Sequence, residues 1–213
     1  MGFKELNASD RIVAVHTDML RHPEFCVLGS VSQIGKVVVD KTHSTAATDG
    51  RDVFYNPDFI MGMSREQLRY LVAHENAHKQ LRHCVEYRHL KKKYPQLYPM
   101  AIDYVVNWQI EQLDPQQKFL ARPTSVPPLI DAKYADMSVP EVIRELLKEQ
   151  QDGGGSDKGE TGGGGGGTLV VLDAHLDPAD SGDEEMDAKS QEEAEKAITN
   201  AIIQGEIVQV QLR

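Results

Sequence analysis

The sequence predicts an α+β fold, in which a small mixed or antiparallel sheet accompanies a long capped helix and the helix that follows it. Runs of β-branched residues separated by a turn signal precede residue 64, and apolar residues recur at helical spacing after it. The chain has 213 residues, of which 40% are hydrophobic. This is enough for one core of ordinary size, or for one core and an appendage.

The first elements are expected to be a helix and short strands. Ser9 and Asp10 can cap a helix that runs to about Arg21, before Pro23 stops it. The β-rich runs lie at residues 25–28, 35–40 and 52–55.

A hairpin is expected around Asp49-Gly50, because this dipeptide tolerates the positive φ angles of a tight turn. Residues 44–48 and 52–55 should therefore pair with each other.

A capping box, Ser64 with Gln67 three residues later, opens the long helix. Its apolar spacing continues to about Leu90. A proline-bounded connection at residues 94–99 leads to the next helix, which ends near Asp114, and a further helix is expected at residues 138–150.

The C-terminal part of the chain differs in composition from the rest. Residues 1–150 carry 19 basic and 19 acidic side chains, so the remainder holds the whole net charge of −10. Ten of the 17 glycines lie at residues 153–167, and the Lys-Ser/Thr of a phosphate-binding loop does not follow them. We therefore predict a domain at 1–150, a flexible linker at 151–168 and an acidic extension at 169–213. The extension should hold a strand at 168–172 and a short helix at about 190–204.

Several classes of protein are excluded or disfavoured. No stretch approaches 18 consecutive apolar residues, which argues against a membrane protein. The first ten residues lack an apolar leader segment, and there are only two cysteines. We expect a cytoplasmic protein, in the host cytoplasm if a phage encodes it.

The sequence His74-Glu75-Asn76-Ala77-His78 lies well inside the capped helix. Two histidines at i and i+4 share a helical face and can both bind one zinc ion at about 2.0–2.1 Å. Glu75 is rotated about 100° from His74, so it can flank the metal and take a proton from its water.

A catalytic zinc needs a third protein ligand. On an unbroken helix His83, Cys84 and His89 cannot close the site, and no glycine lies between His78 and His83 to break it. The next helix carries a polar stripe of Asp103, Asn107 and Glu111 at i, i+4 and i+8.

We predict Asp103 as the third ligand, Asn107 as a supporting or substrate-facing group, and Glu111 as the alternative ligand. In the competing interpretation, Asp103 is an acid favoured by the helix dipole.

The chain resembles the metallopeptidase domain that precedes von Willebrand factor A-like domains in bacterial and phage proteins, within the broad zincin class. The resemblance covers about residues 8–150 and rests on Thr45-Ala46-Ala47-Thr48-Asp49-Gly50, Tyr55-Asn56-Pro57-Asp58-Phe59, His74-Glu75-Asn76-Ala77-His78 with His83, and Ala101-Ile102-Asp103-Tyr104-Val105-Val106-Asn107. It implies a zincin-like fold, a zinc site of His74, His78 and Asp103, and Glu75 as the catalytic glutamate.

Two further expectations follow from this resemblance. Residues 44–48 or 52–55 could supply an edge strand that pairs with an extended substrate, which would place Tyr55 near the cleft. Ordinary packing in the sheet is the alternative for Tyr55. The residues after 167 cannot hold an A-type domain, so such a partner, or another one, would come from a separate chain.

The sequence therefore predicts zinc-dependent hydrolysis of peptide bonds in a protein or peptide substrate, with one Zn²⁺ per chain. The alternative is a non-catalytic interaction or regulatory protein that a metal stabilises. The basic run at residues 88–93 is the one feature that suggests nucleic acid, and the neutral residues 1–150 and the acidic remainder argue against that partner.

Overall fold

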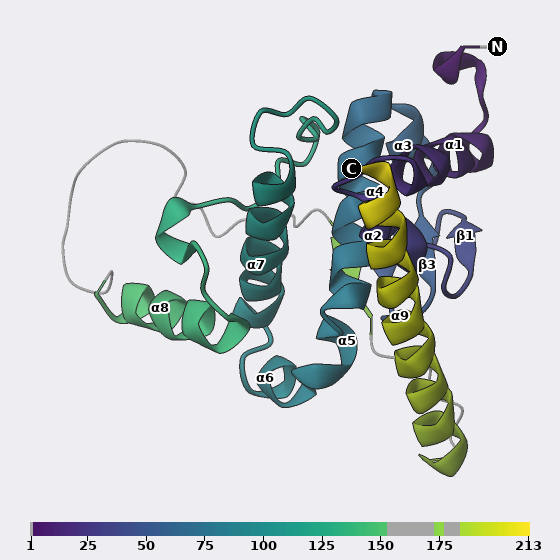
Figure 1. The fold of residues 1–213 in the computed structure, drawn as a ribbon. Helices are drawn as coiled ribbons and strands as arrows, with labels where there is room; N and C mark the ends of the chain where they lie inside the picture. Colours follow the sequence, from purple (N-terminus) through teal and green to yellow (C-terminus); the bar gives the residue numbers. More distant parts are fainter. Residues whose placement is uncertain (1, 153–172, 177–183) are drawn as a thin grey trace, which may run out of the picture.

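The computed structural model describes residues 2–152, 173–176 and 184–213 (Figure 1). The α-helices of these residues are α1 (Ala8–Leu20), α2 (Cys26–Val31), α3 (Pro57–Met61), α4 (Arg65–Gln80), α5 (His83–Glu86), α6 (Arg88–Lys93), α7 (Leu97–Leu113), α8 (Val139–Asp152) and α9 (Glu184–Leu212). The strands are β1 (Val37–Val39), β2 (Ala46–Thr48), β3 (Val53–Tyr55) and β4 (Asp173–His175), and two 3₁₀ turns lie at Phe3–Glu5 and Ala132–Tyr134. The predicted α+β class is confirmed.

The strands form one small mixed sheet in the order β1-β3-β2-β4. The expected hairpin is present, because β2 and β3 pair antiparallel with Ala46 opposite Tyr55. β1 pairs parallel to β3, and β4 pairs parallel to β2. Both strands of the hairpin are therefore interior strands, and the prediction that one of them forms a free edge for substrate is wrong. The strand β4, which covers the edge of β2, comes from far along the chain, and the local sequence pattern of β2 does not indicate this pairing.

The run at residues 25–28 is part of a helix, not the strand that its composition predicts. Phe25, Cys26, Leu28 and Val31 are all buried in α2 or at its start. A short apolar run does not distinguish a buried strand from a buried helix, and here the packing of α2 against α1, α4 and α9 decides.

The capping box forms as predicted at the start of α4. The Ser64 hydroxyl accepts the Gln67 N–H at 3.2 Å, and the Gln67 side-chain oxygen accepts the Ser64 N–H at 3.0 Å. These two bonds satisfy N–H groups that the first turn of a helix leaves without partners.

The long helix does not continue to Leu90. It ends at Gln80, and Arg82 has φ 56° and ψ 33°, a left-handed conformation that costs a non-glycine residue about 1–2 kcal/mol. Two short helices, α5 and α6, follow instead and lead to α7. No glycine or proline lies at this break, and the helical spacing of apolar residues continues past it, so the sequence pattern predicts one uninterrupted helix.

Buried side chains form two clusters on either side of the α4–α7 contact. The first lies around α1, α2, the sheet and α4, and includes Ile12, Phe25 and Leu71. The second joins α7 to α8 and includes Ile102 and Val142. α4 and α7 run side by side between them (Figure 1). Among the described residues, no helix combines the length and the apolar character that crossing a bilayer requires.

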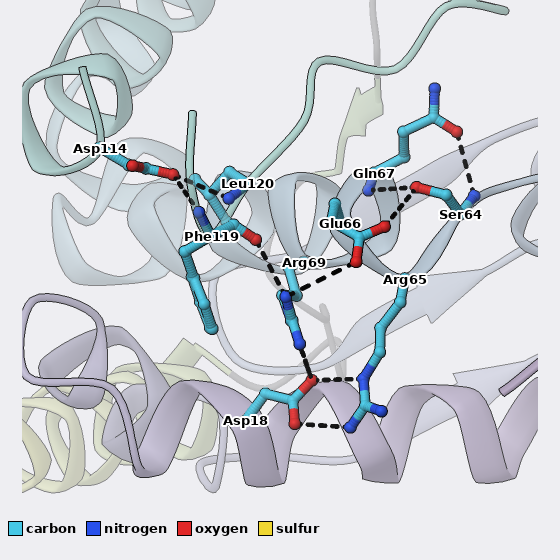
Figure 2. Close-up of polar contacts among 9 residues, drawn as sticks. All are labelled: Asp18, Ser64, Arg65, Glu66, Gln67, Arg69, Asp114, Phe119 and Leu120. Carbon is cyan, nitrogen blue, oxygen red and sulfur yellow. Dashed lines mark hydrogen bonds and ion pairs between the residues drawn. The ribbon is translucent and has the colours of Figure 1, made fainter. Parts of the chain in front are cut away.

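Asp18 on α1 ties the start of α4 to the rest of the protein (Figure 2). Its carboxylate accepts hydrogen bonds from Arg65 at 2.6 and 2.7 Å and from Arg69 at 2.9 Å. Arg69 also donates to the Phe119 carbonyl at 3.1 Å and lies over the Phe119 ring. The loop of Phe119 is held in turn by Asp114, which accepts the backbone N–H groups of residues 118–120.

Replacing Asp18 by asparagine is expected to lower the free energy of unfolding by about 1–3 kcal/mol at pH 7, because two arginines lose a charged acceptor. Burial opposes ionisation, but the hydrogen bonds from Arg65 and Arg69 hold the pKa of Asp18 below its ordinary value of 3.8. The carboxylate therefore stabilises the fold above that pH and loses its contribution as the pH falls through the lowered pKa.

Urea unfolding of the wild type and Asp18→Asn at neutral and acidic pH tests this expectation. The difference between the two proteins should shrink in acid. Asp58→Asn is the matched control, because its exposed pair with Lys41 contributes little. Equal stability of the wild type and Asp18→Asn at pH 7 would contradict the role of Asp18.

The C-terminal helix packs closely on α2 (Figure 1). A Cβ atom on Gly205 would lie 2.6 Å from the Cα of Val27, and the Cys26 thiol donates to the Gly205 carbonyl. α9 is longer than the short helix expected at residues 190–204. The predicted linker glycines and the strand at 168–172 lie outside the described residues. The division at residue 150 stays a prediction, although β4 and α9 both contact the preceding part of the chain.

Gly205→Leu is expected to lower the free energy of unfolding by about 1–3 kcal/mol, because the side chain must displace the backbone of α2. Leucine is the better helix former, so the loss would come from packing and not from propensity. Asn200→Leu places the same residue at an exposed position of α9 and should change stability by less than about 0.5 kcal/mol. Indistinguishable thermal unfolding of the two variants would show that α9 does not pack tightly on α2.

Candidate metal centre

α4 places two histidine nitrogens beside each other. His74 and His78 are one turn apart, both side chains are fully buried, and their Nε2 atoms lie 3.1 Å apart. The bonds at the capped start of α4 and the contacts of Asp18 hold this helix in place. The predicted i, i+4 geometry is thus present in the structure.

α7 contributes Asp103 to the same point. Its Oδ1 atom lies 3.5 Å from Nε2 of His78 and 3.8 Å from Nε2 of His74, and its side chain is also fully buried. Tetrahedral zinc with bonds of about 2.0–2.2 Å has its ligand atoms roughly 3.3–3.5 Å apart. The two nitrogens and the oxygen therefore have the chemistry and the spacing for one metal ion.

Asn107, one turn after Asp103, determines which nitrogen of His74 carries the proton. Its amide nitrogen donates to the Leu129 carbonyl at 3.1 Å, so its Oδ1 atom is the one that faces His74 Nδ1 at 2.8 Å. The Tyr70 hydroxyl donates to the same oxygen at 3.2 Å. Nδ1 of His74 must then donate to Asn107, and Nε2 keeps its lone pair for a metal.

His78 is oriented through its other nitrogen in the same way. Its Nδ1 atom lies 2.9 Å from Nδ1 of His83, which is also buried. Both histidines therefore have a hydrogen-bond partner behind the ring and direct Nε2 toward Asp103. Such partners fix the orientation and tautomer of metal-ligating histidines.

Glu75 is fully buried on the turn of α4 between the two histidines. Burial, and then the nearby charge of Glu75, raise the pKa of Tyr55 well above its ordinary value. Burial lowers the pKa of Lys79 to about 8, against the opposing charges of Asp52, Asp49 and Glu75. Glu75 thus lies within electrostatic range of the Tyr55 hydroxyl, which remains protonated at neutral pH.

The structure brings together most of the residues that the sequence singles out. His74, His78 and Asp103 converge, Asn107 supports His74, and Tyr55 lies near Glu75. Glu111 lies elsewhere and forms a two-bond pair with Arg122 at 2.8 and 2.9 Å. The roles of these residues as ligands and catalytic groups stay predictions.

Sequence reasoning missed three contributors to the centre: Tyr70, the Leu129 carbonyl and His83. Tyr70 lies one turn before His74 on the same face of α4, so its spacing was a signal that could have found it, whereas nothing in the local pattern indicates that Leu129 reaches Asn107. His83 is not among the three converging ligands, as predicted, but the assumption of an unbroken helix is wrong, and the left-handed Arg82 brings His83 behind the His78 ring. The histidine itself, close after the motif, was the one signal that could have found it.

One of the comparisons with known proteins points to the same class of protein. A family model described as "Putative metallopeptidase domain" matches residues 9–211, which include the metal centre and nearly all of α9. Comparison with curated proteins and with solved structures found no match. Since the family match spans most of the chain, from α1 into the last turn of α9, the protein belongs to the "Putative metallopeptidase domain" family.

Proposed function

We propose that this protein is a zinc-dependent peptidase. The observation that carries the proposal is the buried convergence of two Nε2 atoms and one carboxylate oxygen, with each histidine fixed from behind. The family described as a metallopeptidase domain supports it. Histidine nitrogens with a carboxylate suit zinc well, and three protein ligands leave one position for water or substrate.

The residues divide the chemistry between holding the ion and moving a proton. His74, His78 and Asp103 would hold Zn²⁺, which when bound would polarise the scissile carbonyl and lower the pKa of water toward about 7. Glu75 would accept the proton of the attacking water and deliver it to the leaving amine. The Tyr55 hydroxyl has no hydrogen-bond partner among the described residues, and it would donate to the oxygen that gains charge.

The proposal is tested by incubating the zinc-loaded protein with a peptide library and identifying new N-termini by mass spectrometry. Cleavage should disappear when a chelator removes the metal and return when zinc is added back. Cleavage that persists in a metal-free preparation would contradict the proposal.

A structural metal site is the second candidate function. The full burial of all three ligand side chains favours it, because a closed site between α4 and α7 would hold the two clusters of buried residues together. In that case zinc would raise the unfolding temperature, and no peptide would be cleaved under any metal condition.

A further inference from the structure

The left-handed Arg82 places His83 behind a metal ligand. If α4 continued as a regular helix, His83 would lie about 140° around the axis from His78. The break after Gln80 brings the two Nδ1 atoms to 2.9 Å instead, with the ring centroids 5.1 Å apart. The left-handed backbone conformation, which is unfavourable for a non-glycine residue such as Arg82, therefore creates the contact between the two histidines.

His83 is held firmly in this position. The residue is 2% exposed, and its backbone carbonyl accepts a hydrogen bond from the buried Tyr98 hydroxyl on α7. Its ring also lies beside that of Tyr87. These contacts with Tyr98 and Tyr87 come from the fold around His83.

The hydrogen-bond roles of the pair follow from the metal site. A His78 that presents Nε2 to a metal has its proton on Nδ1. That proton can be donated only if Nδ1 of His83 accepts it, so His83 is neutral with its own proton on Nε2. His83 then does for His78 what the Asn107 amide oxygen does for His74.

The C-terminal helix α9 contacts the segment that positions His83 through the side chain of Arg82. The Arg82 guanidinium forms ion pairs with Glu195 on α9 and with Glu86, the latter at 3.2 Å. α9 is anchored independently on α2 by the close approach at Gly205. Glu195, more than 100 positions further along the chain, therefore contacts Arg82, whose backbone conformation orients His83.

We infer that His83 is a positioning residue for the metal ligand His78, and that α9 supports it by holding Arg82 through Glu195. The inference rests on the proposed metal site and not on its catalytic role. It assigns the C-terminal helix a part in the affinity of the centre for its ion.

The test is the affinity of the full-length protein for Zn²⁺, measured by competition with a chromophoric chelator. His83→Phe keeps a ring and removes the acceptor, and it should weaken zinc binding about 10–100-fold. His83→Asn puts an amide oxygen near the position of Nδ1 and should return the affinity to within about fivefold of the wild type. His89→Phe makes the same substitution at an exposed position of α6 and should change nothing.

A purely structural role for His83 gives a different pattern. Unfolding temperature would fall in the metal-free protein, and the asparagine variant would bind zinc as weakly as the phenylalanine variant. Visible absorption of bound Co²⁺ adds a readout of ligand geometry, which should change in His83→Phe and return toward the wild type in His83→Asn. If His83→Phe does not fold, His83→Leu replaces it.

The contribution of α9 is tested with Glu195→Gln and its matched control Glu192→Gln. Glu192 lies on the same helix and pairs with Lys196 at the surface. Since the Arg82–Glu195 pair is partly exposed, Glu195→Gln should weaken zinc binding by about two- to fivefold, and unchanged affinity would separate α9 from the centre. The effect should vanish in the His83→Phe background, because both changes act on one contact.

Two further results would overturn the inference. Unchanged zinc affinity in the acceptor-removing variant at position 83, Phe or Leu, would remove His83 from the centre, and fully additive effects of Glu195→Gln and His83→Phe would separate α9 from it. Failure of the wild type to bind zinc is a distinct result that removes the proposed metal site itself. A wild type that binds zinc without cleaving peptides leaves the inference standing and removes the proposed activity.

Discussion

Glu75→Gln is expected to reduce peptide hydrolysis by about 10²–10⁴-fold while leaving zinc bound. Glutamine fills the same volume but cannot accept a proton, so the attacking water loses its base. Glu75 is not among the three converging ligands, so metal affinity should change little. The fold should also persist, since the substitution removes a buried charge without creating a cavity.

The matched control is Glu145→Gln, which removes the charge of a half-buried glutamate on α8 that pairs only with Lys148 among the described residues. Activity, zinc content and unfolding temperature should all stay at the wild-type level in this control. Measurement of the single-turnover rate with saturating enzyme separates the chemical step from substrate binding. A Glu75→Gln protein with wild-type turnover would exclude Glu75 as the base.

Asp103→Ala is expected to weaken zinc binding by more than about 100-fold, since loss of a supporting partner alone typically costs 10–100-fold. At a zinc concentration about 1,000 times the wild-type dissociation constant, the wild type should gain about 4 kcal/mol, and a variant that binds about 100-fold more weakly should gain only about 1.4 kcal/mol.

Glu111→Gln on the same helix is the control for Asp103→Ala. It removes a carboxylate that pairs with Arg122 and should leave zinc affinity unchanged. Thermal unfolding of the three proteins with and without zinc measures both effects together. Loss of zinc binding in Glu111→Gln and its retention in Asp103→Ala would reverse the assignment of the third ligand.

The parts of the centre that sequence analysis predicts are those encoded by local spacing. His74 and His78 share a face because four residues separate them, and Ser64 with Gln67 shows that they lie inside a helix. Asp103 stands out as a charged residue in an apolar stretch, which requires a partner in a folded core. The spacing of the two histidines does not depend on how distant segments pack, whereas the meeting of Asp103 with them requires the contact of α7 with α4.

The missed parts depend on packing or on backbone strain. The composition of residues 25–28 predicts a strand, and the helix α2 is explained only when its contacts with α9 are known. The edge of the sheet at β2 is covered by β4, which comes from beyond residue 170. The helix break at Arg82 contains no glycine that would predict it from the sequence. Contacts such as the ion pair with Glu195 compensate the unfavourable backbone conformation of Arg82. His83 therefore could not be placed by counting residues along a helix.

The central claim is that His74, His78 and Asp103 bind one metal ion, and the metal content of the purified protein tests it most directly. Mass spectrometry of wild-type protein prepared without added metal should find about one zinc per chain, and Asp103→Ala should hold far less. A wild type that holds no zinc, even after stoichiometric zinc is added and the protein is dialysed, would contradict the account.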